Sequence, residues 1–120
     1  MTIARFKQTG NKFDIKIKGH ALFKPGNDIV CAGCSTLAYT LINVLVAEHD
    51  NDEGSAFDLF NYYTDKKDGV CIIKATVKDD RLGCIDTEIT TIATGFALLA
   101  SEHPKHVRFK YLPCDDTSIN

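Results

Sequence analysis

The sequence predicts an α+β domain in which two helices, one of them long and largely buried, pack on an antiparallel or mixed sheet in the order ββαββαβ. Two kinds of periodicity carry this prediction. Apolar residues that alternate with polar ones indicate strands, and apolar residues spaced by three and four indicate a helix. With 120 residues, 44% of them hydrophobic, the chain can bury one core. We therefore expect a single domain over residues 1–112 and a flexible tail over residues 113–120.

The first two strands are predicted to form a hairpin. Residues 2–8 and 12–18 flank a Thr-Gly-Asn turn, and every second residue of the later segment is apolar. This alternation is typical of a strand with one solvated face. The second strand ends next to His20, and Pro25-Gly26 then marks a turn.

A long helix is predicted from Ile29 to about His49. Asp28 is a good N-cap, because its carboxylate can accept the amide hydrogens two and three residues further on, including that of Cys31. Apolar residues occur on nearly every side of the segment, unlike a surface helix with one apolar stripe. Such a helix is roughly 30 Å long. It must be covered by the sheet and by the second helix or another subunit.

The second half of the chain is predicted to add a hairpin, a helix and a last strand. Strands over residues 56–64 and 70–77 follow an acidic loop over residues 50–55, which lacks the spacing of a calcium loop. The last strand covers residues 107–111. The helix covers residues 80–101, and its apolar face consists of Ile85, Ile89, Ile92, Phe96 and Leu99.

Composition and charge exclude several classes of function. The formal net charge is −2, and Lys and Arg are spread along strands and turns, so we expect no direct nucleic-acid partner. No apolar run approaches the roughly 20 residues of a membrane helix, and the first residues do not resemble a signal peptide. We therefore expect a cytoplasmic protein that does not bind membranes. The five cysteines are an odd number, so we expect reduced thiols, most of them in the core.

The segment from Gly19 to Ser35 carries the candidate chemistry. Cys31 lies in the first turn of the predicted helix, where the helix dipole and unpaired amide hydrogens favour a thiolate. His20 can arrive from the strand end as a base toward the thiol and an acid toward a leaving amine. Ser35 shares a helix face with Cys31, and Asp28 either orients His20 or only caps the helix. From the residues alone, a packed cysteine and a histidine without catalytic roles stay the simpler interpretation.

The order of residues in this segment is more specific than their chemistry. It contains a GHA motif, a short loop, a DIVCA motif and a serine, formed by Gly19-His20-Ala21, Asp28-Ile29-Val30-Cys31-Ala32 and Ser35. This combination resembles the ribosomal-processing cysteine protease family, called Prp. The resemblance implies a homodimeric cytoplasmic endopeptidase. We expect no cofactor. Such an enzyme removes a short N-terminal extension from a large-subunit ribosomal protein, or processes a phage structural protein.

The resemblance also implies roles for individual residues. Cys31 corresponds to the nucleophile, His20 to the general base, and Asp28 and Ser35 to supporting residues of the site. The family's loop between the histidine and the cysteine is thought to order over substrate. In this chain the predicted substrate loop contains Leu22, Phe23, Pro25 and Gly26.

Two other functions stay open at this point. Residues 31–34 form a CxxC motif at a helix start, the placement of a thiol–disulfide oxidoreductase site, in which Cys34 is the redox partner. A non-catalytic protein of the same fold that contacts the ribosome is the other interpretation. His103, His106 and the distant Cys114 fall short of the four ligands of a zinc site, so we expect no metal.

Overall fold

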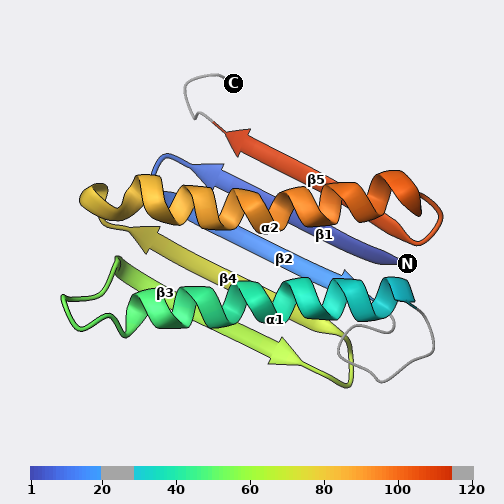
Figure 1. The fold of residues 1–120 in the computed structure, drawn as a ribbon, viewed down its shortest axis with the longest axis horizontal. Helices are drawn as coiled ribbons and strands as arrows, with labels where there is room; N and C mark the ends of the chain where they lie inside the picture. The colour runs from blue at the N-terminus through green and yellow to red at the C-terminus, as the bar shows by residue number, and fades with distance from the viewer. Residues whose placement is uncertain (20–28, 115–120) are drawn as a thin grey trace.

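A mixed five-stranded sheet is the frame of the computed structural model, which describes residues 1–19 and 29–114 (Figure 1). Its order is β3-β4-β2-β1-β5, and only the pair β1–β5 is parallel. The strands are β1 (Thr2–Thr9), β2 (Lys12–Gly19), β3 (Phe57–Asp65), β4 (Val70–Val77) and β5 (Val107–Cys114). The predicted α+β class and the ββαββαβ order are confirmed. β5 extends through residues 113 and 114, which the sequence assigned to the tail, because these residues pair with the end of β1.

Two antiparallel helices cover one face of this sheet (Figure 1). They are α1 (Ile29–His49) and α2 (Leu82–Glu102), and the short 3-10 helix η1 (Asp79–Arg81) leads into α2. α1 lies over the half of the sheet formed by β3 and β4, and α2 lies over the half that contains β1 (Figure 1). The opposite face of the sheet, which neither helix covers, is called the open face below.

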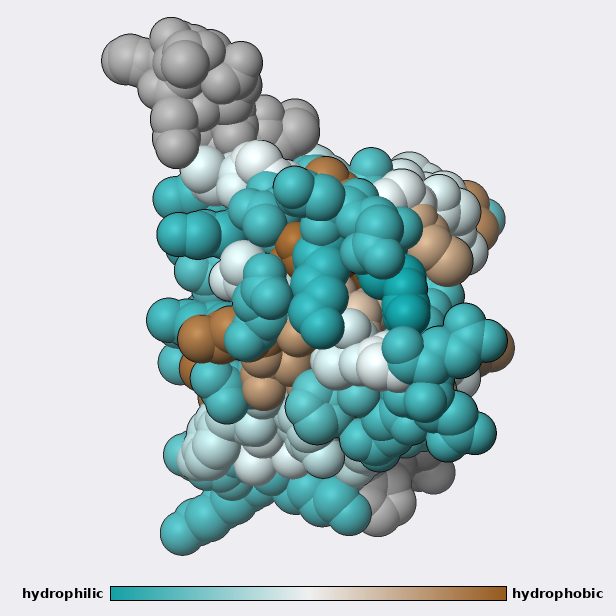
Figure 2. Space-filling view, turned by 90° about the vertical axis from the view of Figure 1, so that its left-hand side faces the viewer, coloured by the Kyte–Doolittle hydropathy of each residue, from teal (hydrophilic) through white to brown (hydrophobic). Residues whose placement is uncertain are grey.

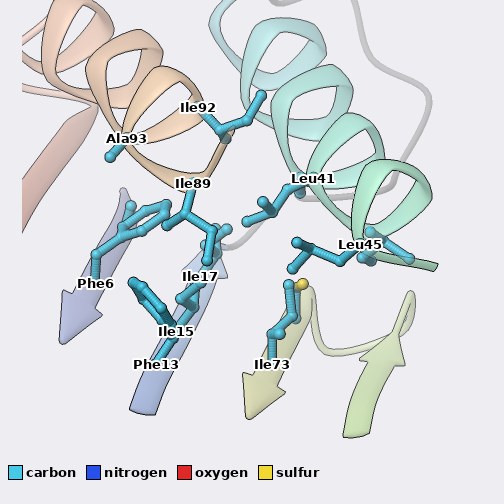
Figure 3. Packing of buried hydrophobic residues seen from close by; sticks show 14 of the residues in the cluster. Phe6, Phe13, Ile15, Ile17, Leu41, Leu45, Ile73, Ile89, Ile92 and Ala93 are labelled. Atoms are coloured by element: carbon cyan, nitrogen blue, oxygen red, sulfur yellow. The ribbon is translucent and has the colours of Figure 1, made fainter. Parts of the chain in front are cut away.

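The core lies between the helices and the covered face of the sheet. Alternate residues of β1, β2 and β4 are buried there, as the period of two predicted. Leu41 and Leu45 of α1 and Ile89 of α2 point toward these strands (Figure 3). The Phe6 ring packs against Phe96 of α2 at a centroid distance of 5.9 Å and against Phe109 of β5 at 5.8 Å. This packing fixes the helix layer over the sheet.

α1 buries one stripe along its length, formed by Val30, Cys34, Ala38, Leu41, Ile42 and Leu45. The sheet and α2 cover this stripe together. The two helices approach each other closely at Gly95, where a Cβ atom would lie 2.9 Å from Cδ2 of Leu37. A side chain at this position would displace the end of the Leu37 side chain, so the glycine lets Leu37 pack directly against the backbone of α2.

By length and composition, both helices are apolar enough to span a membrane. The expectation that no segment reaches this length was therefore wrong. Core helices pass the same test, and here both helices lie on the sheet with buried residues along one side. Packing on the sheet accounts for the buried side of each helix, which is 33% of the apolar stretch of α1 and 28% of that of α2.

Candidate active site at the start of α1

The end of β2 and the start of α1 lie at the same end of the molecule (Figure 1). β2 ends at Gly19 and α1 begins at Ile29, so the predicted catalytic segment joins these two points. Several predicted site residues fall in this connection and lie outside the described residues. They are His20, Leu22, Phe23, Pro25, Gly26 and Asp28.

Cys31 is the third residue of α1 and is half-buried. The sequence placed it in the first turn of the helix, and the structure agrees. Amide groups of a first turn have no partner within the helix, and the positive end of the dipole lies there. Ser35 follows one turn later and is also half-buried. The structure therefore brings Cys31 and Ser35 to neighbouring positions at a helix end suited to an anion.

Neighbouring residues fix the first turns of α1 in place. Val30 and Cys34 are buried on either side of Cys31. Gly33 faces α2, where a Cβ atom would lie 3.4 Å from Cδ1 of Leu99. Cys31 is thus held at the surface of a packed helix, whereas the helix start at Ile29 is 79% exposed.

The strand end before His20 is held by a close backbone contact that sequence reasoning missed. Gly19 is the register partner of Thr2, and a Cβ atom on Gly19 would overlap Oγ1 of Thr2 and lie 2.9 Å from its Cβ. The amide of Gly19 donates to the carbonyl of Gly69 at 2.9 Å, and the amide of Thr2 donates to that of His106 at 2.8 Å. The glycine of the GHA motif is therefore required by packing. The signal in the sequence for this close contact is a glycine opposite a β-branched residue in a predicted hairpin.

A family model described as cysteine protease Prp matches residues 1–108. The chain belongs to the Prp family. It is therefore a cysteine protease, as the GHA and DIVCA motifs predicted. No curated protein sequence matches this chain.

Solved structures share the fold, among them two of a Prp protease. SMU.848 from Streptococcus mutans has a TM-score of 0.68 and 24% identity, over 95% of this chain and 99% of that chain. The S. aureus ribosomal processing protease Prp with a covalently linked product peptide has a TM-score of 0.69 and 19% identity, over 92% and 99%. The same S. aureus protease with a substrate peptide has a TM-score of 0.66 and 18% identity, with the same coverage.

The other described thiols of this Prp protease differ from Cys31 in exposure. Cys34 and Cys71 are fully buried, and Cys84 is exposed at the start of α2. Burial raises the pKa of the Cys71 thiol to about 11, so this thiol stays protonated at neutral pH. Cys34 is buried beside the half-buried Cys31. The second thiol of a CxxC site attacks within the protein, so this burial does not decide against the CxxC interpretation.

A second cluster of ionisable groups lies at the other end of the helices. Ligand atoms of Glu48, Cys84 and Glu88 lie within 4.8 Å of one another, and this is the one such trio of potential metal ligands in the described part of the chain. Figure 2 shows this end of the molecule, which is mostly hydrophilic. Since Glu48 follows Cys31 by 17 residues of one helix, the cluster lies about 25 Å from the thiol. It takes no part in the site at the start of α1.

Glu88 makes the stability of this protein depend on pH. Desolvation raises the pKa of its carboxyl to about 7, and the hydrogen bond to Glu48 and its charge act in the same direction. A raised pKa means that the folded state binds the proton more tightly, so this stabilisation is complete below about pH 4.5 and is lost as the pH rises through 7. We expect Glu88→Gln to be more stable than the parent protein at pH 8, by about 1 kcal/mol after allowance for solvent screening.

The measurement is urea unfolding of the parent protein and Glu88→Gln at pH 5 and pH 8. Glu102→Gln, which changes an exposed carboxylate at the far end of α2, is the control. The control should follow the parent protein at both pH values. Equal pH dependence of all three proteins would contradict the assignment to Glu88.

Proposed function

We propose that this Prp protease removes an N-terminal extension from a large-subunit ribosomal protein, with Cys31 as the nucleophile. The observation that carries the proposal is the half-buried Cys31 in the first turn of α1, within a chain that matches the Prp family over residues 1–108. The S. aureus protein of the same fold is described as a ribosomal processing protease and has been solved with substrate and product peptides.

The proposed reaction is acyl transfer at the start of α1. The Cys31 thiolate attacks the scissile carbonyl, and amide groups of the first helical turn stabilise the oxyanion. His20 accepts the thiol proton and later donates a proton to the leaving amine, so that an acyl-thioester remains on Cys31. Water, activated by His20, then hydrolyses the thioester and restores the thiol. Ser35 and Asp28 support the site by hydrogen bonding to the reacting groups.

The substrate is proposed to be an extended peptide that lies across the start of α1. The predicted substrate-binding residues Leu22, Phe23, Pro25 and Gly26 lie in the connection before α1, outside the described residues. The exposed side chain of Ile29 offers an apolar contact next to Cys31.

The proposal is tested with a purified ribosomal protein that carries its N-terminal extension and with the same protein lacking it. Mass spectrometry of the products should show one cut in the extended protein and none in the shortened one. Disulfide reduction by the same enzyme preparation, measured in parallel with insulin, distinguishes an oxidoreductase. Binding of the ribosomal protein without cleavage or disulfide turnover would leave the non-catalytic interpretation.

A homodimer in the cytoplasm is also proposed, with the outer side of the helix layer as the interface. α1 contains no Asp, Glu, Lys, Arg or His from Ile29 to residue 47. α2 contains none of these residues from Ile89 to Ser101. Tyr39 and Leu98 are 37% and 57% exposed on these helices. A second copy can cover this surface without burying charges.

The mass in solution checks the dimer. Light scattering at micromolar concentration should give twice the mass of the chain, and Leu98→Glu should lower it to that of one chain. Leu59→Glu, which alters an exposed leucine of β3, is the control and should stay dimeric. A monomeric parent protein would contradict the proposal.

A further inference from the structure

The open face of the sheet concentrates the basic residues of the protein. The strand register places eight of the 14 Lys and Arg residues there, and all eight are exposed: Arg5, Lys7, Lys12, Lys16, Lys18, Lys74, Arg108 and Lys110. Two of the 16 acidic residues, Asp14 and Asp65, share this face by register. The face thus carries an excess of six positive charges on a protein with a formal net charge of −2.

The spread of Lys and Arg along the sequence was the reason to expect no nucleic-acid partner. The fold shows that this reason does not hold, because these residues gather on one face. The basic residues are spread along the sequence, but they occupy every second position of strands that are neighbours in the sheet. Side chains of one face repeat with a period of two, so residues far apart in sequence meet on the same surface. Net charge and isoelectric point do not report this separation of charges within the molecule.

Three of the cations lie opposite one another across the strands, whereas Lys7 and Lys74 both lie opposite Asp14. Arg5 of β1 pairs in register with Lys16 of β2 on one side and with Lys110 of β5 on the other. Neighbouring strands are about 4.8 Å apart, and like charges at such positions destabilise a sheet. Among the described residues, none of the eight cations lies within 4 Å of a carboxylate oxygen as an ion pair. The ion pair found in this part of the chain joins His49 and Asp50. A bound anion would reduce this repulsion between the cations.

The open face also has shallow hollows between the basic side chains. One of about 350 Å³ is bordered by Lys7, Lys12 and Lys74. A second of about 460 Å³ is bordered by Arg5, Arg108 and Lys110. A third of about 200 Å³ includes Arg5 and Lys16. Each hollow therefore has three cations on its rim, and Asp14 also borders the first and the third.

We propose that the open face binds the phosphate backbone of RNA without sequence preference. The chemistry of phosphate recognition follows from the surface itself, whereas the choice of RNA over DNA rests on the proposed ribosomal function. β1 and β2, which carry most of the cations, present no aromatic residue on this face. Tyr63 of the edge strand β3 is the exposed ring that the described register places there, and one ring at the edge gives successive bases no row on which to stack. Contacts to phosphate alone give binding that depends strongly on salt and little on sequence.

Two other occupants fit this surface less well. A second copy of the chain would bring two equally basic faces together. A protein partner normally anchors on a central apolar or aromatic cluster. The exposed apolar and aromatic residues here lie away from the centre or apart, because Leu59 and Tyr63 belong to the edge strand β3 and Ile3 to β1 on the other side of β2. The regular array of cations favours a polyanion with regularly spaced charges.

The test is fluorescence anisotropy of the full chain with a labelled RNA hairpin of mixed sequence at 50 and 200 mM KCl. Release of counterions from three phosphates predicts that affinity falls by about fortyfold between these concentrations. A second hairpin of unrelated sequence should bind equally well. The assay needs no cleavage, so its result is independent of the protease activity.

Two double variants with the same change in net charge distinguish an effect of the open face on RNA binding from an effect of net charge. Arg5→Glu/Lys16→Glu should weaken RNA binding at least tenfold and reduce the salt dependence. Lys66→Glu/Lys67→Glu makes the same change in net charge in the exposed β3–β4 turn and should weaken binding less than threefold. Thermal unfolding of both variants shows whether they stay folded.

The proposal would be overturned by an absence of salt-dependent RNA binding, by equal weakening in the two double variants, or by binding of polyglutamate as tight as that of RNA. Tight binding of polyglutamate would indicate an acidic protein partner. A DNA hairpin of the same sequence distinguishes the two nucleic acids. Equal affinity for both would support phosphate recognition, and tighter binding of DNA would contradict the assignment to RNA.

Discussion

Replacing Cys31 with alanine is expected to abolish cleavage of the N-terminally extended ribosomal protein. The variant lacks the atom that attacks the carbonyl, so neither the oxyanion nor the acyl-thioester can form. Loss of a nucleophile that works together with a base lowers the rate by at least about a thousandfold. The substitution removes one sulfur atom from a half-buried position, so the variant should fold and still bind the substrate.

Single-turnover cleavage followed by mass spectrometry measures this effect. Cys84→Ala is the matched control, because it removes an exposed thiol at the far end of the helix layer. It should cleave at the rate of the parent protein. In the parent protein, an acyl-enzyme trapped by rapid acid quenching should map to the peptide that contains Cys31. Residual cleavage in Cys31→Ala at more than about a tenth of the parent rate would contradict the role of this thiol.

Local patterns in the sequence were sufficient to predict the elements of the fold. The alternation in residues 12–18 gave β2, because a strand with one buried face buries every second residue. The apolar series from Ile85 to Phe96 gave the buried face of α2 for the corresponding reason. The position of Cys31 in a helix start also followed from local residues, since capping and turn signals lie within a few positions of it.

Features that depend on strand register or on helix packing were not accessible in the same way. The basic open face exists because β5 lies beside β1 and β4 beside β2, and no local pattern specifies these neighbours. Glu48 and Glu88 approach each other because α1 and α2 run in opposite directions over the sheet. In each case the property arises from residues that are distant in sequence and become neighbours only in the folded protein.

Replacing Gly19 with alanine is expected to destabilise the protein and impair cleavage together. The new Cβ atom overlaps Oγ1 of Thr2, a buried side chain of the neighbouring strand, so β1 and β2 must separate at this end. Overpacking of this kind costs about 1–3 kcal/mol of stability. Since His20 follows Gly19 directly, displacement of the strand end moves the proposed base relative to Cys31. A shift of about 1 Å is enough to lower the rate about a hundredfold.

A double-mutant cycle distinguishes this steric cause from a general effect of the added methyl group. Thr2→Gly removes the atoms that collide with the new side chain, so Gly19→Ala should cost less stability and less activity in the Thr2→Gly background than in the parent protein. Gly83→Ala adds the same methyl group in the first turn of α2, where nothing lies within 4 Å, and should leave cleavage unchanged. Urea unfolding and single-turnover cleavage of the four proteins of the cycle give the two coupling energies. If Thr2→Gly restores stability but not cleavage, the glycine acts on the site through more than this contact; if it restores neither, the collision with Thr2 is not the reason that position 19 is a glycine.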